Sequence, residues 1–293
     1  MPRSNRGCRN VRLDGYGLAF EVERILPLSE PPLVDSHFHV WREDLPLIDR
    51  AWHRKGRDAT IEQLIETLDT HGVTFGVIAA ASLHGLYNDY VRAALKRHRR
   101  LRATATVAPT TDIYQLERMQ AEGFVGIRFV WELLDEIPDI HSGDYRMLLR
   151  RVADLGWHVH LTDRAHRFAD TVAAVEASGA KVVIDHLGLF DTPEGINGAA
   201  FKTLMAAVER GRTWVKLSGG FRFKPASEAK QYAQALVKLT GGERLVWGSD
   251  WPFAAFEDEV TYADTIAAFE DWVPDPAVRR IISGTTPLRL YFT

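Results

Sequence analysis

Two histidines separated by one residue, His37 and His39, form a pair of side chains that could carry out chemistry. They lie in the segment LVDSHFHV, whose apolar and β-branched residues predict a strand. A pleated strand directs residues i and i+2 to the same side, so both imidazoles are expected to face one space. Such a pair can bind one divalent ion or polarise one oxygen atom, although packing explains it equally well when it is considered alone.

Asp250 directly follows a second apolar segment, RLVWGS, and is flanked by tryptophans. Desolvation beside them is expected to raise the pKa of this carboxyl and suit it to act as a general base; a turn aspartate before a proline is the structural alternative. His186 closes a third predicted strand, VVIDH, where a lone histidine is more often structural. Three strands that end in His or Asp favour a joint catalytic role for His37, His39, His186 and Asp250.

Two arginines are predicted near the ends of further strands. Arg128 ends the segment GIRF, and Arg222 lies just beyond TWVKLS. A guanidinium binds a carboxylate through two parallel hydrogen bonds, so the pair predicts a small anionic substrate. Salt bridges to neighbouring acidic residues are the structural alternative for both.

Smaller polar residues complete the predicted substrate-binding set. Ser82, His84 and Asn88 lie in SLHGLYN after the second predicted strand, and Thr162 ends the fifth. Loops after strands commonly carry binding residues, although His84 could instead bind backbone carbonyls. His158 and His160 repeat the His-x-His spacing in the fifth predicted strand. His160, nearer its end, is a reserve candidate, and packing of the pair in the layers inside the barrel is the alternative.

Eight short apolar segments alternate with eight amphipathic ones, a pattern typical of βα units and a parallel sheet. Strands are predicted at residues 33–40, 73–81, 101–107, 124–130, 157–162, 181–186, 213–218 and 244–249. Helices are predicted at residues 58–71, 87–100, 112–122, 143–155, 166–179, 199–211, 226–240 and 259–271. Glycines that precede several strands are expected to end these helices: Gly72, Gly123, Gly156, Gly179 and Gly211.

An uninterrupted series of eight units predicts an α/β fold of the closed (β/α)8 TIM barrel type rather than an open sheet. The barrel domain is predicted over residues 33–293, preceded by a short N-terminal extension over residues 1–32. Active sites of such barrels lie at the C-terminal ends of the strands, where each of the candidate residues is expected.

Composition narrows the class of protein further. The chain has 293 residues, 46% of them hydrophobic, and a formal net charge of -3, which gives no indication of nucleic acid or membrane as a partner. The single Cys8 and the absence of a recognisable signal peptide predict a cytoplasmic protein. The sequence leaves open whether the protein forms a homo-oligomer. A basic cluster at residues 92–102 is expected to be the solvated end of a helix, with an acidic partner as the alternative.

Seven motifs occur in the order and spacing of the amidohydrolase superfamily: VDSHFHVW, ASLHGLYN, GFVGIRF, GWHVH, VVIDHLG, VKLSG and LVWGSDWP. Residues 33–293 resemble its amidohydrolase-related branch, which includes 2-pyrone-4,6-dicarboxylate lactonase and sugar lactonases. The resemblance implies that Asp250 activates water, that the three histidines named above polarise a lactone carbonyl, and that Arg128 and Arg222 bind a carboxylate. It therefore predicts a hydrolase that cleaves a small carboxylated lactone, with a role in aromatic compound catabolism.

The resemblance also bears on the cofactor. This branch generally works without a metal, and no lysine or glutamate suited to bridging two metals lies at the end of the fourth predicted strand, where Phe129 and Val130 follow Arg128. We therefore expect no required cofactor, while a single zinc or manganese ion on His37, His39 and Asp250 stays open. The alternative functions are a metal-dependent decarboxylase of the same superfamily and a non-catalytic binding barrel.

The chain departs from the dicarboxylate lactonase pattern at three places. Glu132 and Leu133 stand where a second arginine is expected, Thr162 replaces a tyrosine, and Phe253 replaces a histidine. Loss of one guanidinium removes a charge-assisted hydrogen bond, at a cost of about 1.5 to 3 kcal/mol for a carboxylate. The substrate is therefore expected to be smaller or less charged than the pyrone dicarboxylate.

Overall fold

The computed structural model describes residues 30, 32–53, 58–189 and 194–293, so the predicted N-terminal extension lies almost wholly outside the described residues. Strands and helices alternate along the described chain. The strands are β1 (Val34–Phe38), β2 (Phe75–Ile78), β3 (Leu101–Ala105), β4 (Phe124–Val130), β5 (His158–Thr162), β6 (Lys181–Ile184), β7 (Thr213–Leu217) and β8 (Leu245–Trp247). The helices between and after them are α1 (Ile61–Thr70), α2 (Asp89–Arg97), α3 (Ile113–Glu122), α4 (Gly143–Asp154), α5 (Ala165–Ala177), α6 (Ala199–Glu209), α7 (Glu228–Thr240) and α8 (Tyr262–Trp272).

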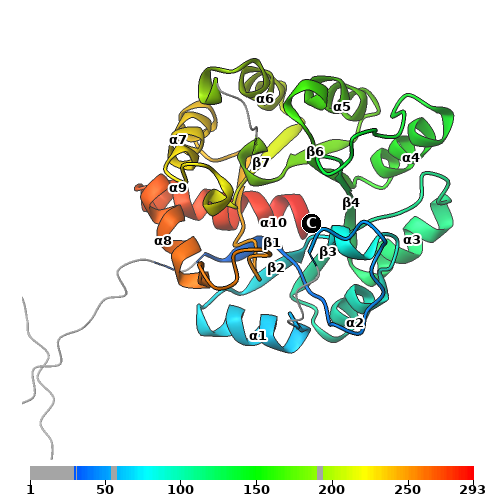
Figure 1. The fold of residues 1–293 in the computed structure, drawn as a ribbon, viewed down its shortest axis with the longest axis horizontal. Coiled ribbons are helices and arrows are strands. Elements are labelled where there is room, and N and C mark those ends of the chain that lie inside the picture. Colours follow the sequence, from blue (N-terminus) through cyan, green and yellow to red (C-terminus); the bar gives the residue numbers. More distant parts are fainter. Residues whose placement is uncertain (1–29, 31, 54–57, 190–193) are drawn as a thin grey trace, which may run out of the picture. The chain divides into compact units, whose positions relative to one another are not determined.

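The eight strands form one parallel sheet in the order of the sequence, and each strand pairs with the next. The sheet closes just beyond β8, where the backbone N–H of Asp250 donates to the carbonyl of His37 at 2.8 Å. The N–H of His39 likewise donates to the carbonyl of Trp251 at 2.8 Å. With helices around the ring of strands (Figure 1), the prediction of a (β/α)8 TIM barrel is confirmed.

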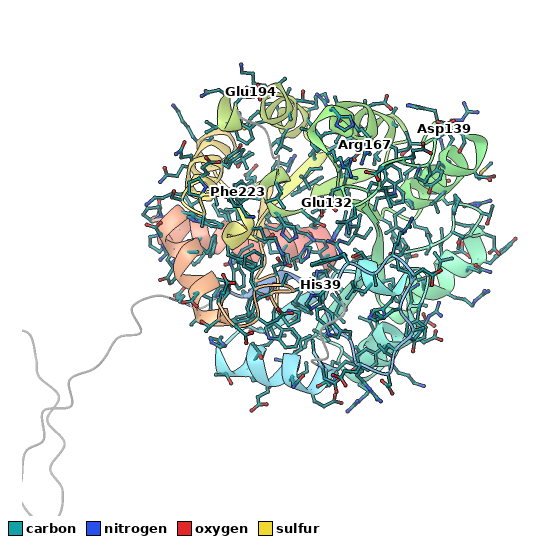
Figure 2. All side chains as sticks on the ribbon, in the orientation of Figure 1. His39, Glu132, Asp139, Arg167, Glu194 and Phe223 are labelled. Atoms are coloured by element: carbon teal, nitrogen blue, oxygen red, sulfur yellow. The ribbon has the colours of Figure 1, made fainter. Side chains whose placement is uncertain are left out.

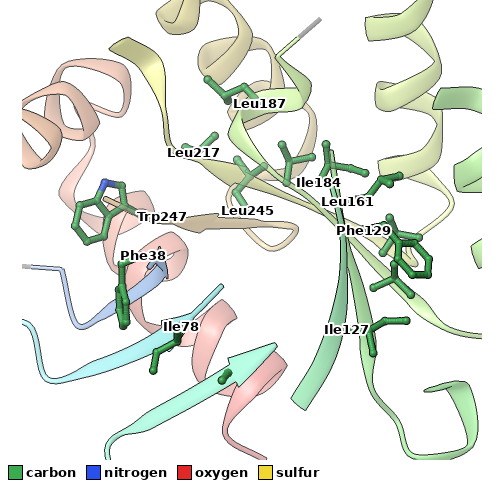
Figure 3. Packing of buried hydrophobic residues seen from close by; sticks show 14 of the residues in the cluster. Phe38, Ile78, Ile127, Phe129, Leu161, Ile184, Leu187, Leu217, Leu245 and Trp247 are labelled. Carbon is green, nitrogen blue, oxygen red and sulfur yellow. The ribbon is translucent and has the colours of Figure 1, made fainter. Parts of the chain in front are cut away.

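Alternation along the strands separates two sets of side chains. Large apolar residues such as Phe38, Ile127, Leu161 and Leu217 belong to the main buried cluster (Figure 3). Their neighbours in sequence therefore point to the barrel interior, because successive strand residues face opposite sides. The interior set is polar near the C-terminal ends of the strands: His37, Arg128, His160 and Lys216.

The opposite end of the barrel interior is filled by apolar residues. Val77, Val183 and Val246 from three strands pack with Leu290 and Tyr291 from α10 (Thr286–Tyr291). This helix follows α9 (Pro276–Arg280) and a π-helical turn, Ile281–Thr285. The polar layer therefore rests on a packed floor rather than on a channel.

Helix ends follow the sequence signals. The five glycines expected to end helices all adopt a positive φ, from 69° at Gly156 to 108° at Gly123, a backbone region that favours glycine. Among the described residues, no helix has both the length and the apolar composition needed to cross a membrane.

Candidate active site

Four of the predicted residues converge at the C-terminal end of the barrel. His37 and His39 come from β1 and its end, His186 directly follows Asp185 after β6, and Asp250 follows β8. Oδ1 of Asp250 lies 3.6 Å from Nε2 of His37, 3.7 Å from Nε2 of His39 and 3.9 Å from Nε2 of His186. Three imidazoles therefore surround one carboxylate oxygen.

The backbone at two of these residues is strained. His186 has a φ of 51° and Asp250 a φ of 64°, in the left-handed region that side chains other than glycine rarely occupy. Both residues lie in the turn just after a strand, β6 or β8, at the C-terminal end of the barrel. Strain of this kind is concentrated at functional sites, which agrees with the convergence of these groups.

The neighbours of His39 determine which of its nitrogens carries the proton. Nδ1 of His39 lies 2.8 Å from the carbonyl oxygen of Ala79, which can only accept a hydrogen bond. Burial lowers the pKa of His39 to about 3, so the ring is neutral and its proton is on Nδ1. Nε2 of His39 is therefore an acceptor facing the site.

Lys216 determines the state of His37. Its ammonium lies 2.9 Å from Nδ1 of His37, 2.8 Å from Nδ1 of His160 and 2.9 Å from Oδ1 of Asp185. An ammonium has protons to donate and no acceptor, so both imidazole nitrogens must accept from it, while Asp185 is its ion-pair partner. Burial and the Lys216 charge lower the pKa of His37, although Oδ1 of Asp185, 3.3 Å from Nδ1, acts to raise it. Because Nδ1 accepts from Lys216, the neutral ring carries its proton on Nε2. That N–H faces two acceptors, Nε2 of His39 at 3.2 Å and Oδ1 of Asp250 at 3.6 Å.

A second buried carboxylate, Asp185, connects this network to an arginine. Oδ2 of Asp185 accepts from Nε of Arg128 at 2.9 Å, and Nη1 of Arg128 donates to the carbonyl of Ala80 at 2.7 Å. Burial acts to raise the pKa of Asp185, but Lys216 and Arg128 outweigh it and hold that pKa well below its usual range. Asp185 is therefore ionised and fixes both cations.

The prediction that desolvation raises the pKa of Asp250 is wrong. Burial does raise it, but Nε of Arg222 lies 2.7 Å from Oδ2 and, together with the surrounding histidines, brings the pKa below its usual value. Oδ1 has no hydrogen-bond partner in the described structure. Asp250 is thus an ionised carboxylate with one oxygen held by a guanidinium and the other available to accept a proton.

A cavity of about 210 Å³ opens above this cluster. His39, His186 and Asp250 line it, together with Arg128, Arg222 and Glu132. Its remaining wall is largely apolar and aromatic: Trp41, Trp52, Leu83, Val130, Leu133 and Leu189. The cavity suits a small molecule with an apolar face and a few polar groups.

The other predicted binding residues are divided between this cavity and its surroundings. Ser82 lines the cavity and accepts a hydrogen bond from the indole N–H of Trp52 at 3.1 Å. His84 binds the carbonyl of Pro46, and Asn88 donates to the carbonyls of Leu86 and Thr106. These two therefore hold the loop beside the cavity rather than line it.

Thr162 and His160 lie deeper in the barrel. Both are buried, and neither lines the cavity. The hydroxyl of Thr162 has no described partner, whereas its carbonyl accepts the backbone N–H groups of Trp131 and Glu132. His160 reaches the site only through Lys216.

The basic cluster lies at the other end of the barrel. Arg92 pairs with Asp89 and Glu122, and Arg97 pairs with Glu62. These exposed ion pairs agree with the expectation of a solvated helix end. A cavity of about 770 Å³ there is lined by Lys96, Arg99 and the first residues of several strands, and lacks the convergent carboxylate and imidazoles of the polar end.

The site contains residues that could ligate a metal, but neighbouring cations disfavour the binding of a divalent ion. His37, His186 and Asp250 each offer a ligand atom, and these atoms lie within 4.8 Å of one another. A ligating imidazole must present a lone pair, whereas Lys216 leaves the proton of His37 on the nitrogen that faces Asp250. Arg222 also occupies one oxygen of Asp250, so the set fits a divalent ion poorly.

Sequence reasoning missed two members of this network, Lys216 and Asp185. Both lie inside motifs noted for other reasons, VKLSG and VVIDHLG. A lysine between valine and leucine in a buried strand is the signal that could have identified Lys216, because a buried ammonium requires fixed acceptors.

Comparison with known proteins supports the resemblance to amidohydrolases. The model of the Amidohydrolase family matches residues 34–293, and the chain belongs to this family. The 4-sulfomuconolactone hydrolase of Hydrogenophaga intermedia is 25% identical over 267 residues, covering 88% of each chain. The 2-pyrone-4,6-dicarboxylate hydrolase of Comamonas testosteroni is 25% identical over 299 residues, covering 96% of this chain and 95% of that protein.

A solved structure gives the same result for the fold. A probable 2-pyrone-4,6-dicarboxylic acid hydrolase from Acinetobacter baumannii, with citric acid bound, superposes with a TM-score of 0.85 at 28% identity. The match covers 89% of this chain and all of that one. The resemblance found in the sequence motifs is therefore confirmed, and the chain is an enzyme of the amidohydrolase family.

Proposed function

We propose that the protein hydrolyses the ester bond of a small lactone that bears an acidic group. The observation that carries this proposal is the ionised Asp250, whose free Oδ1 lies among three imidazole Nε2 atoms at the base of the cavity. Relatives named as hydrolases of 4-sulfomuconolactone and 2-pyrone-4,6-dicarboxylate support the choice of a lactone.

In this reaction Oδ1 of Asp250 takes a proton from water while the water oxygen bonds to the acyl carbon. Negative charge develops on the carbonyl oxygen, the ring C–O bond then breaks, and the leaving oxygen receives the proton. The hydroxyl of Ser218 lies 3.0 Å from Nδ1 of His186 and can donate to it, which leaves an N–H on Nε2 for the oxyanion. A preorganised donor of this kind is typically worth about 3 to 4 kcal/mol.

Arg128 and Arg222 would orient the substrate with the guanidinium N–H groups that do not bind other protein atoms. Arg128 uses Nε and Nη1 on Asp185 and Ala80, and Arg222 uses Nε and Nη1 on Asp250 and Ala254. Nη2 of each guanidinium has no described partner, and both arginines line the cavity. We assign these nitrogens to the substrate's acidic group.

We propose that this reaction requires no metal, because Lys216 leaves the proton of His37 on Nε2, which faces the site, and Arg222 occupies Oδ2 of Asp250. A metal-dependent decarboxylase is the second candidate, supported by the grouping of His37, His186 and Asp250. It predicts release of CO2 that stops when a chelator removes the ion.

One experiment tests these alternatives together. Lactones with and without carboxylates are incubated with the wild-type protein and with Asp250→Asn, with and without chelator. We expect wild-type hydrolysis to survive the chelator and Asp250→Asn to lose at least about 1000-fold in kcat. Glu259→Gln, an exposed acid on the same loop, is the control and should match the wild type. Retained hydrolysis by Asp250→Asn contradicts the proposal, and chelator-sensitive CO2 release favours the decarboxylase.

A further inference from the structure

One carboxylate in the cavity has no role in the hydrolysis described above. Glu132 follows β4 and lines the cavity with His39, Arg128 and Arg222. Glu132 and His39 both lie near the centre of the ring of strands (Figure 2). Among the described residues, no hydrogen bond or ion pair reaches the Glu132 side chain. Partial burial removes some of the hydration of this carboxylate and the described part of the protein supplies no partner, so the side chain is suited to accept a hydrogen bond from a bound substrate.

The backbone holds Glu132 in place on both sides. Its N–H donates to the carbonyl of Thr162 at 3.2 Å, and its carbonyl accepts from Nε of Arg164 at 2.9 Å. Partial burial raises the pKa of Glu132 even though Arg128 and Arg222 act to lower it. The side chain is therefore a desolvated acceptor on a fixed loop, rather than a mobile surface acid.

The charges around the cavity define what this acceptor can bind. Three cations and three carboxylates lie at or directly below it: Arg128, Lys216 and Arg222, and Glu132, Asp185 and Asp250. With the histidines neutral, these charges cancel. A dianionic substrate would add two uncompensated charges and place one of them near Glu132. An ammonium group on the substrate would in turn be repelled by the two arginines, so a neutral donor fits best.

We propose that Glu132 forms a recognition subsite that accepts a hydrogen bond from a hydroxyl group of the lactone and excludes a second anionic group. The preferred substrate class is then a hydroxylated lactone with at most one acidic group. This inference rests on the proposed lactone hydrolysis and specifies its substrate.

Affinity tests the subsite without relying on turnover. Binding is measured by calorimetry in the Asp250→Asn background with δ-gluconolactone and δ-valerolactone, which share a six-membered lactone ring and differ in their hydroxyl groups. The expected advantage of the hydroxylated lactone is at least about ten-fold, as for a hydrogen bond to a charged group. Glu132→Met should abolish that advantage, because it removes the acceptor while keeping the length of the side chain.

A second variant separates charge from hydrogen bonding. Glu132→Gln keeps an acceptor and removes the charge, so it should retain part of the hydroxyl preference and bind 2-pyrone-4,6-dicarboxylate at least about ten-fold more tightly. Glu136→Gln, an exposed acid on the same loop, is the matched control and should change neither affinity.

The outcomes distinguish the subsite from the catalytic proposal. The subsite is overturned if the hydroxylated lactone fails to bind, if Glu132→Met keeps the preference, or if Glu136→Gln has the same effect. If Glu132-dependent binding is found but protein with Asp250 intact hydrolyses no lactone, the lactonase assignment fails while the subsite stands.

Discussion

The chemistry of this site depends on which nitrogen of each imidazole carries a proton. The carbonyl of Ala79 makes Nε2 of His39 an acceptor, whereas the ammonium of Lys216 makes Nε2 of His37 a donor. Two histidines that look equivalent in a His-x-His motif therefore have opposite roles. The N–H of His37 lies 3.2 Å from Nε2 of His39 and faces Oδ1 of Asp250 at 3.6 Å.

The role of Lys216 can be measured in the wild-type protein. Nitrogen-15 NMR of histidine-labelled protein should show the His37 proton on Nε2. Lys216→Met removes the donor to Nδ1, and we expect kcat to fall by about 10- to 100-fold with a smaller change in KM.

Lys230→Met, which removes only an exposed ion pair with Asp271, is the control and should leave both constants unchanged. A wild-type spectrum with the His37 proton on Nδ1 would refute the assigned role, whether or not the Lys216 variant folds.

At the scale of elements, the site depends on the junction between β1 and the end of β8. Asp35 on β1 accepts hydrogen bonds from the backbone N–H of His37 and Ser249, both at 3.0 Å, and from the hydroxyl of Tyr262 at 2.8 Å. Burial nevertheless raises the pKa of Asp35 to about 6. This carboxyl joins the first strand to the segment that carries Asp250.

Gly248 allows the two segments to approach each other. A Cβ at this position would lie 2.6 Å from Cβ of His37 and 2.9 Å from its backbone nitrogen, and neither atom is at the end of a flexible side chain. Gly248→Ala should therefore displace β1 and destabilise the fold by about 1 to 3 kcal/mol.

Displacement of His37 by about 1 Å should also reduce kcat by about 100-fold. Urea unfolding and steady-state kinetics measure the two effects. Gly143→Ala is the control, since nothing lies within 4 Å of its added Cβ. A Gly248→Ala variant as stable and active as this control would disprove the role of the junction.

At the scale of the whole molecule, five of the buried histidines make stability sensitive to acid. Burial lowers the pKa of each one, to about 3 for His39 and about 4 for His186. The others shifted in the same direction are His37, His158 and His160. Between pH 6.5 and these lowered values the unfolded chain binds more protons than the folded one, so stability falls as the pH falls.

Each such histidine contributes a slope of about 1.4 kcal/mol per pH unit across its window. Asp35, with its pKa raised to about 6, acts in the opposite direction between about pH 6 and its unfolded value. We expect the free energy of unfolding in urea to decrease clearly from pH 7 to pH 5.

His158 offers a matched variant for this test. Both of its ring nitrogens lack a described partner, and its ring packs 4.9 Å from that of Tyr291. His158→Phe should retain the packing, remove one titrating group and flatten the slope. Equal slopes for the two proteins would show that His158 does not contribute.

The sequence alone determined the barrel and the residues at its mouth. Alternating apolar segments predict eight βα units, and the period of two along a strand places His37 and His39 on one side. The ends of the strands then bring His186 and Asp250 to the same space, since all eight strands run in parallel. These inferences needed only local periodicity and the rule that such sites lie at the C-terminal ends of strands.

Only the tertiary structure decided the electrostatics. The pKa of Asp250 is lowered because Arg222, 28 residues away in the sequence, lies against its carboxylate. The proton of His37 is placed by Lys216, which is 179 residues away. Charges and hydrogen bonds act over a few ångströms between side chains whose separation in sequence is unrelated to their distance in space. Periodicity can place a residue on a face, but it cannot identify the partner that sets its protonation.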